Sequence, residues 1–428
     1  MKIGIIVSFY DFRADVRDLI GEFQNAGHQV VLFFRESEEK DISRHPIEGL
    51  EYRKIKEEKR NFRNRLLEYA FLFFKRLPSS RQNYFLMELF KISNNPAKGS
   101  RNFSQLVLFI QRLRLNFVSY DFLLENIQYS AATPIDDIEH FIGFTEFQSD
   151  YFAARLLHEN RPLSIYVYSW DHPCKHTRFS KKFHYQVWSP GIREDLIRLQ
   201  GVPGANVSVA GATQFSYLWE YQHKPAPLPR PVPFQYVYFC CAIGIKDLIP
   251  MELDIIRSIA EELEKLRPDW KLFVRPYPVL NQWEIYKPLL SLPNVLLDDG
   301  FRTNPFPNYK AANFDKFLKL ESAELVLHSG STIGLEACFL NVPAALVDFG
   351  YGTQRSGLSV YGFIHQYQND KYLLDMGLAL KSAAQLSDLL DNPEKNLVQN
   401  REAASEFHLL PLKEFVSLFI RKPEYGGF

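Results

Sequence analysis

The sequence predicts an α/β protein made of two doubly wound domains with parallel sheets. Its 428 residues are about two domains' worth of chain. In both halves, short runs rich in Val, Ile and Leu alternate with segments whose apolar residues recur at helical spacing. This is the pattern of buried parallel strands joined by helices. Residues 223–234 separate the halves with five prolines and no regular pattern, which is typical of a linker.

The first domain, residues 1–222, begins with a strand at 2–9, a helix at 15–26 and a second strand at 29–35. This order is the start of a Rossmann-like unit. Helical segments separate four further strands, which we expect at 138–144, 163–169, 184–188 and 206–210.

Residues 58–130 interrupt this alternation. Leu, Phe, Lys and Arg recur here at helical spacing, so that we expect an insertion of two to four helices. The segment has twelve Lys or Arg and five Asp or Glu. One interpretation is an ordinary solvated face. The other is a basic, aromatic surface for an anionic acceptor or for lipid headgroups, which would give peripheral contact with the inner face of the plasma membrane.

The second domain, residues 235–409, starts a fresh α/β series, and residues 410–428 form a last helix that we expect to pack back toward the first domain. Strands are expected at 235–242, 271–275, 294–297, 324–328 and 344–348. Helices are expected at 251–266, 314–322, 332–340 and 383–390.

Composition excludes several classes of protein. Fifty basic residues balance fifty acidic ones, so that no overall field favours nucleic acid. The four cysteines lack the spacing of a metal site or a disulfide framework, and two of them are adjacent in an apolar run, which favours the reducing cytoplasm. No apolar run approaches the roughly 20 residues that cross a bilayer.

The strongest local signal lies between Leu325 and Cys338, where a buried strand ends, small residues turn the chain and a helix begins. Backbone N–H groups and the helix dipole at such a junction suit a diphosphate. The simpler interpretation is a Ser/Thr N-cap with a glycine for backbone freedom. We expect this junction to bind the phosphates or a sugar hydroxyl of a phosphate-containing donor substrate. The residues concerned are His328, Ser329, Gly330, Ser331, Thr332 and Glu336.

Two other strand ends in the second domain carry basic residues. Arg275 ends one predicted strand before a proline-rich loop, where its guanidinium could pair with phosphate oxygens. Gly244 and Lys246 follow the first strand of this domain and offer a weaker site of backbone amides and a cation.

A general base is expected in the first domain. Asp171 and His172 follow a buried strand, and either Asp171 takes a proton from an acceptor hydroxyl or it orients His172. The sequence Asp-His-Pro is also a common turn. Glu146 and Asp15 follow other strands and are alternative bases.

Several motifs are missing from the sequence. It contains no G-x-G-x-x-G after the first strand, no P-loop, no G-x-S-x-G elbow and no H-E-x-x-H. It also lacks a D-x-D pair for a metal-bound diphosphate, so we expect that no metal is required. The negative charge of a leaving group would instead be stabilised by an arginine and a helix dipole.

Taken in order, these elements resemble the GT-B superfamily of glycosyltransferases, in particular bacterial enzymes of surface-polysaccharide biosynthesis. The similar segments are the opening unit with Gly27-His28-Gln29-Val30, the stretch around Ser169-Trp170-Asp171, and His328 to Pro343. The second is also distantly similar to a Trp-His-Gly element of the teichoic-acid polyol-phosphate transferases. Tyr277 stands where those transferases often have His in Arg-x-His-Pro.

The resemblance implies two Rossmann-like domains that face a central cleft. A nucleotide-sugar donor would bind the second domain, and a glycan or lipid-linked glycan acceptor would enter from the first, with no cofactor besides the nucleotide-sugar substrate. Two alternatives share the architecture: a non-hydrolysing sugar-nucleotide epimerase, and a catalytically inactive scaffold that acts as a partner protein.

Overall fold

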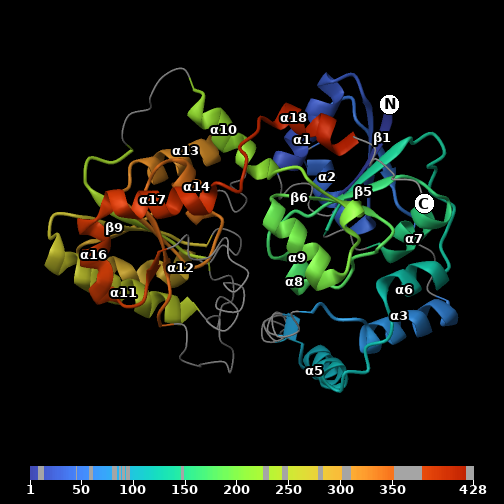
Figure 1. Ribbon diagram of the computed structural model, residues 1–428, viewed down its shortest axis with the longest axis horizontal. Coiled ribbons are helices and arrows are strands. Elements are labelled where there is room, and N and C mark those ends of the chain that lie inside the picture. Colours follow the sequence, from blue (N-terminus) through green and yellow to red (C-terminus); the bar gives the residue numbers. More distant parts are fainter. Residues whose placement is uncertain are drawn as a thin grey trace. The chain divides into compact units, whose positions relative to one another are not determined.

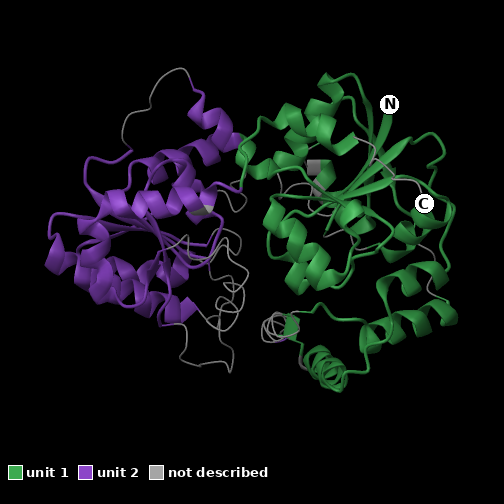
Figure 2. Ribbon diagram, viewed as in Figure 1, with its two compact units in different colours: residues 1–88, 97–216, 407–428 green, residues 89–96, 217–406 purple. Residues whose placement is uncertain are grey.

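A computed structural model of the chain divides into two compact units (Figure 2). Unit 1 comprises Met1–Glu88, Ala97–Ser216 and Phe407–Phe428, and unit 2 comprises Leu89–Pro96 and Tyr217–Glu406. The structure describes residues 1–7, 14–44, 46–56, 61–79, 84–85, 88, 92, 97–145, 149–224, 231–242, 249–277, 283–300, 310–350 and 378–420.

Unit 1 is built on a seven-stranded parallel sheet in the order β3-β2-β1-β4-β5-β6-β7. Its strands are β1 (Lys2–Ile6), β2 (Gln29–Phe34), β3 (Glu51–Lys54), β4 (His140–Phe144), β5 (Leu163–Tyr166), β6 (His184–Val187) and β7 (Val207–Val209). Ile5 in the interior strand β1 pairs with Leu32 on one side and Ile142 on the other, and all three are buried. Burial on both faces explains why these strands are continuous apolar runs.

The helices of unit 1 are α1 (Ala14–Asn25), α2 (Glu39–Arg44), α3 (Phe62–Phe74), α5 (Lys98–Arg112), α6 (Tyr120–Asn126), α7 (Asp150–His158), α8 (His172–Lys175), α9 (Pro190–Gln200) and α18 (Leu412–Ile420). The last helix, α18, packs on α1 (Figure 1). The Phe419 ring lies 5.2 Å from that of Tyr166, and Gln186 Nε2 donates to Leu418 O at 2.9 Å. The chain therefore returns to unit 1 after it completes unit 2.

The predicted helical insertion contains α3, α5 and α6. Within unit 1, α6 packs on α7, α3 on α6, and α5 on α3, so that α5 lies at the end of this series (Figure 1). Asn61 caps α3, because its side chain accepts from the amide of Asn64 at 2.8 Å. Tyr151 in α7 donates to Glu68 in α3 at 2.5 Å. The insertion is therefore tied to the rest of unit 1 by polar contacts as well as by apolar packing.

Unit 2 is built on a six-stranded parallel sheet in the order β10-β9-β8-β11-β12-β13. Its strands are β8 (Tyr236–Cys240), β9 (Lys271–Arg275), β10 (Val295–Leu297), β11 (Leu325–His328), β12 (Ala344–Val347) and β13 (Ala379–Leu380). Its helices are α10 (Ser216–Gln222), α11 (Ile249–Leu266), α12 (Trp283–Tyr286), α13 (Lys310–Glu321), α14 (Ile333–Phe339), α16 (Leu386–Asp391) and α17 (Pro393–Ala404).

Helix α10 precedes the proline-rich segment in the sequence but packs with unit 2. Tyr221 donates to Glu321 at 2.5 Å, and Gln222 donates to the carbonyl of Phe339 at 2.7 Å. The division between the units therefore falls at Ser216 rather than at residue 222. Over the described ranges, no helix is both long and apolar enough to cross a bilayer.

Candidate active site

In unit 2, the order of the strands reverses between β8 and β11. The chain passes from β8 outward to β9 and β10, then returns to β11 and continues to β12 and β13. Open parallel sheets bind ligands outside the carboxyl ends of the strands at such a reversal. Cys240 at the end of β8 pairs with Arg275 on one side and His328 on the other. The fold thus brings two predicted site residues to one edge.

His328 organises the turn that follows β11. Its ring is fully buried, and this burial lowers its pKa to about 4. Nδ1 accepts from the amide of Gly330 at 3.2 Å, so that the neutral ring carries its proton on Nε2. A side chain on Gly334 would place Cβ 2.6 Å from that Nε2. The imidazole therefore occupies the space above the first turn of α14 and has a structural role.

Gly330 has a φ of 80°, a left-handed conformation that favours glycine. Its amide is bonded to His328, so this N–H is used within the turn. Backbone freedom therefore explains this glycine.

Ser331 and Thr332 complete the turn. The Thr332 backbone is already helical at the N-cap position of α14, and its side chain makes no capping hydrogen bond. The Ser331 hydroxyl is buried and has no hydrogen-bond partner in the part of the chain that the structure describes. Leaving such a group unsatisfied costs about 1–3 kcal/mol. A ligand that bonded to this hydroxyl would remove that cost.

Glu336 lies one turn into α14 and is held by a lysine from α13. Lys316 Nζ is 2.7 Å from Glu336 Oε1, and the two side chains are only 9% and 6% exposed. Burial lowers the pKa of Lys316, although the charge of Glu336 opposes this. Glu336 Oε2 is buried and has no hydrogen-bond partner among the described residues. One carboxylate oxygen is therefore fixed, and the other can accept from a ligand hydroxyl.

Arg275 is buried at the end of β9, where its carbonyl accepts from the amide of Cys241 at 3.0 Å. Its charge contributes to lowering the pKa values of both Lys316 and Asp298. The guanidinium thus acts electrostatically on two buried charged residues of unit 2. Gly244 and Lys246, the other predicted donor residues, lie outside the described residues.

Glu252, in the first turn of α11, joins three segments at the same edge. Its carboxylate accepts from the Ala242 amide at 3.2 Å, from Ser329 Oγ at 3.3 Å and from the Tyr286 hydroxyl at 2.8 Å. Complete burial raises its pKa to about 7. The predicted donor residue Ser329 is therefore bonded to a carboxyl group that titrates near neutrality.

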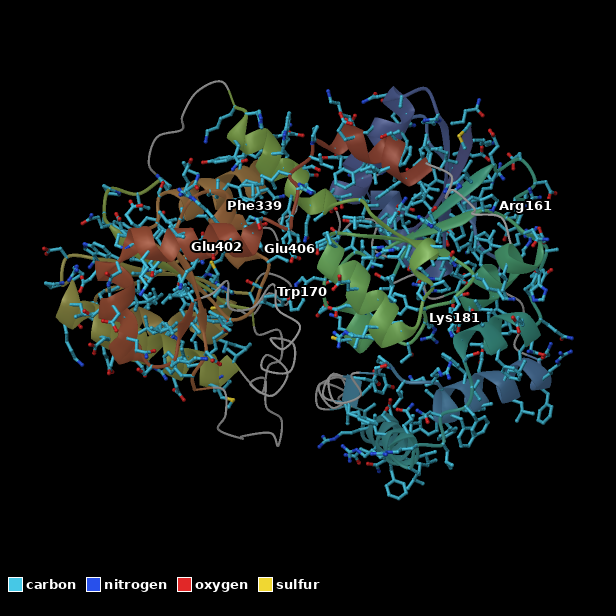
Figure 3. All side chains as sticks on the ribbon, in the orientation of Figure 1. Arg161, Trp170, Lys181, Phe339, Glu402 and Glu406 are labelled. Carbon is cyan, nitrogen blue, oxygen red and sulfur yellow. The ribbon has the colours of Figure 1, made fainter. Side chains whose placement is uncertain are left out.

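In unit 1 the strand order reverses between β1 and β4. Trp170, labelled in Figure 3, lies four residues beyond the end of β5, and Asp171 follows it. The predicted base Asp171 accepts from Ser169 Oγ at 2.7 Å and from Lys175 Nζ at 2.6 Å. Burial alone raises the pKa of Asp171, but the Lys175 charge and these hydrogen bonds outweigh it and lower the pKa. The carboxylate is therefore a poor proton acceptor.

His172 follows β5, as Asp171 does, but its ring contacts the segment that follows β4. Its Nδ1 is hydrogen-bonded to the hydroxyl of Thr145, which follows β4, and that hydroxyl also accepts from the Tyr168 amide at 3.2 Å. If Thr145 donates to Nδ1, the proton of the ring lies on Nε2, and if Nδ1 donates, Nε2 is the acceptor nitrogen of the ring. His176 packs edge-on, with ring centroids 4.5 Å apart.

Asp15, another predicted base, joins elements of unit 1. It is buried in the first turn of α1 and accepts from Tyr168 and Thr213 hydroxyls, both at 2.6 Å. Two such bonds suit a carboxylate that holds loops together. Glu146 lies outside the described residues.

Three important residues were missed in the sequence: Lys316, Glu252 and Thr145. Lys316 and Glu252 lie on amphipathic helices, where a charged residue ordinarily faces solvent. Only the packing of α13 and α11 shows that these two are buried. Among the described residues, no group of three or more His, Cys, Asp or Glu is arranged to hold a metal ion.

Comparison with known proteins identifies the architecture. No protein-family model matches the chain, and no curated protein matches its sequence. Solved structures do match. A protein described as a UDP-N-acetylglucosamine 2-epimerase from Listeria monocytogenes is similar with a TM-score of 0.50 at 11% identity, over 96% of this chain and 93% of that one. The structure of Staphylococcus aureus MnaA with UDP is similar with a TM-score of 0.50 at 12% identity, over 96% of this chain and 94% of that one.

The chain has the GT-B fold. The predicted fold class, α/β with two parallel Rossmann-like sheets, is confirmed. MurG from Acinetobacter baumannii is also similar, with a TM-score of 0.48 at 11% identity over 98% of this chain and 99% of that one.

Proposed function

We propose that this GT-B protein is a glycosyltransferase. Unit 2 binds a nucleotide-sugar donor at the carboxyl ends of β8 and β11, and unit 1 binds a surface-glycan acceptor. The observation that carries the proposal is the group of buried polar residues at the point where the strand order of unit 2 reverses. The Ser331 hydroxyl and Glu336 Oε2 are buried there without partners in the described chain. Buried polar groups are usually bonded to protein or to ordered water, so these two atoms are placed to bond to a ligand.

Each of these residues has a separate role in donor binding. Arg275 offers a cation for the phosphates, and the Ser331 hydroxyl donates to a phosphate or sugar oxygen. Glu336 accepts from a hydroxyl of the ribose or of the sugar through Oε2, while Lys316 holds Oε1. A structural relative, S. aureus MnaA, is known with UDP, and this supports a nucleotide as a ligand of this chain.

For the acceptor side, we assign the general base to His172. Its ring contacts Thr145 at the strand-order reversal of unit 1, whereas Asp171 is paired with Lys175. An imidazole is the side chain that most often acts as a general base. In the reaction, Nε2 takes the proton of the acceptor hydroxyl as its oxygen forms a bond to the anomeric carbon. The bond from that carbon to the phosphate oxygen of the donor breaks, and the nucleotide leaves with the electron pair on that oxygen.

Product analysis tests this proposal. The protein is incubated with a panel of UDP-, GDP-, dTDP-, ADP- and CMP-sugars, with and without a mixture of lipid-linked glycan acceptors. A glycosyltransferase releases the nucleotide and extends the acceptor, and it does so much faster when acceptor is present. An epimerase converts the nucleotide sugar without any acceptor. If no nucleotide is bound or consumed, the inactive-scaffold alternative replaces the proposal.

A further inference from the structure

The helical insertion of unit 1 exposes an unusual amount of apolar surface. Of the thirteen large hydrophobic side chains exposed in the described chain, ten lie between residues 62 and 122. Phe62 is 84% exposed and Phe117 is 75% exposed. Scattered exposed hydrophobic residues are normal, but a concentration on one structural element marks an interaction site.

The apolar side chains form stripes on two adjacent helices. On α3 the exposed residues recur at intervals of four and three, and on α5 at intervals of three, so each set lies on one helical face. We call these six residues the apolar strip: Phe62, Leu66, Tyr69, Phe103, Leu106 and Phe109.

Ring contacts join the two stripes. Tyr69 stacks on Phe73 with centroids 6.4 Å apart, and Phe73 meets Phe103 edge-on at 5.9 Å. The apolar surface is therefore continuous from α3 to α5.

The opposite side of α5 is packed in the ordinary way. Val107 and Leu108 are buried, and buried Gln111 donates to the Leu72 carbonyl at 2.8 Å while it accepts from the Tyr84 hydroxyl at 3.1 Å. The helix is thus anchored through one face, and the apolar strip belongs to the folded arrangement. Figure 3 shows side chains extending outward from α5 at the edge of unit 1.

Basic residues predominate around the apolar strip, and the one acidic residue of α3, Glu68, is half-buried and accepts from Tyr151. From residue 89 to residue 120 the sequence contains five Lys or Arg and no Asp or Glu. Arg101 and Arg112 on α5 are exposed, as are Arg63 and Arg65 on α3. A neutral protein that collects cations around exposed Phe and Leu side chains presents a surface complementary to an anionic one.

We propose that this surface of α3 and α5 docks the protein on an anionic lipid bilayer. Aromatic and Leu side chains enter the boundary between headgroups and acyl chains, and the arginines contact lipid phosphates. A soluble protein partner fits less well, because protein interfaces surround an apolar centre with a rim of mixed polar residues. The chain that contains α5 carries only positive charges over 32 consecutive residues, 89–120. The inference is independent of the reaction proposed above, because a membrane surface and a sugar-transfer site are tested separately.

Co-sedimentation with vesicles tests the docking surface on the full-length protein. The wild type should bind vesicles of equal parts phosphatidylglycerol and phosphatidylcholine but not phosphatidylcholine alone, and salt should weaken this binding. Each cation lost should weaken binding by about fivefold, so Arg101→Gln with Arg112→Gln should lose more than tenfold. Lys40→Gln with Lys265→Gln removes the same charge from exposed sites outside the insertion and should bind like the wild type.

Phe62→Ser with Phe109→Ser separates the apolar contribution from charge. It should also lose at least tenfold in binding, and its melting temperature should be unchanged because both side chains are exposed. Equal binding by the two surface variants and the wild type would overturn the proposal, as would a wild type that ignores anionic vesicles. If instead the wild type dimerises in sedimentation velocity and the Phe variant does not, the surface is an interface between copies and the lipid assignment is wrong.

Discussion

The buried pair between Lys316 and Glu336 gives the sharpest test of the site's construction. The two side chains are 2.7 Å apart at Nζ and Oε1 and nearly excluded from water. Replacing Lys316 with Met keeps the length of the side chain but leaves the Glu336 carboxylate buried without its cation. Removing one partner of such a pair costs about 3–5 kcal/mol.

The double variant Lys316→Met with Glu336→Leu removes both charges together. Replacing a whole buried pair with apolar residues of similar size is often close to neutral. We therefore expect the double variant to recover most of the stability that the single variant loses. The coupling between the two positions should be about 3 kcal/mol, well above the 0.2–1 kcal/mol of exposed pairs.

Urea unfolding, monitored by hydrogen exchange of peptides from α13 and α14, measures the stability of unit 2 in each variant. Reading local peptides avoids the assumption that both units unfold together. A Lys316→Met variant as stable as the wild type would show that the pair is not buried as described. A double variant no more stable than the single one would refute the reasoning from an uncompensated charge.

Three further changes test the two sites. Arg275→Gln should weaken nucleotide binding by roughly tenfold to a hundredfold in calorimetry, the usual effect of a lost charge-assisted hydrogen bond; an unchanged affinity removes Arg275 from the donor site. His172→Gln should lower turnover by about 10²–10⁴-fold with nucleotide affinity unchanged, while Asp171→Asn should cost less than about tenfold; the reverse order would give the base to Asp171. Burial raises the pKa of Glu252 from 4.5 to about 7, so the folded state binds this proton more tightly and loses stability as the pH rises through 7. Glu252→Gln should remove that loss between pH 5 and 8, whereas the exposed Glu261→Gln on the same helix should not, and an unaltered pH profile would contradict the raised pKa.

Much of the fold could be predicted because parallel strands buried on both faces leave a clear apolar signal. The predicted strand at 271–275 matches β9, and most other strands are shorter than predicted by one or more residues. The missed strands are weak in the sequence. β3 at the edge of its sheet reads Glu-Tyr-Arg-Lys and is only partly buried, and β13 has two residues. Tertiary pairing rather than local pattern makes these segments extended.

The candidate site was less accessible from sequence. Strand ends identified Arg275 and His328, because the carboxyl ends of parallel strands share one edge. The roles of individual side chains could not be read. The sequence pattern did not show that Lys175 would form an ion pair with Asp171, or that His328 would accept a hydrogen bond from the Gly330 amide. These contacts depend on rotamers and packing between elements that are distant in the chain.

The central claim is that unit 2 binds a nucleotide at the carboxyl ends of β8 and β11. Hydrogen–deuterium exchange of the full-length protein, with and without saturating UDP, GDP, dTDP, ADP or CMP, tests it most directly. We expect at least one nucleotide to slow exchange in peptides that cover 271–277 and 325–336, with the core strands of unit 1 unaffected. Protection confined to unit 1, or no protection with any of these nucleotides, would contradict the claim.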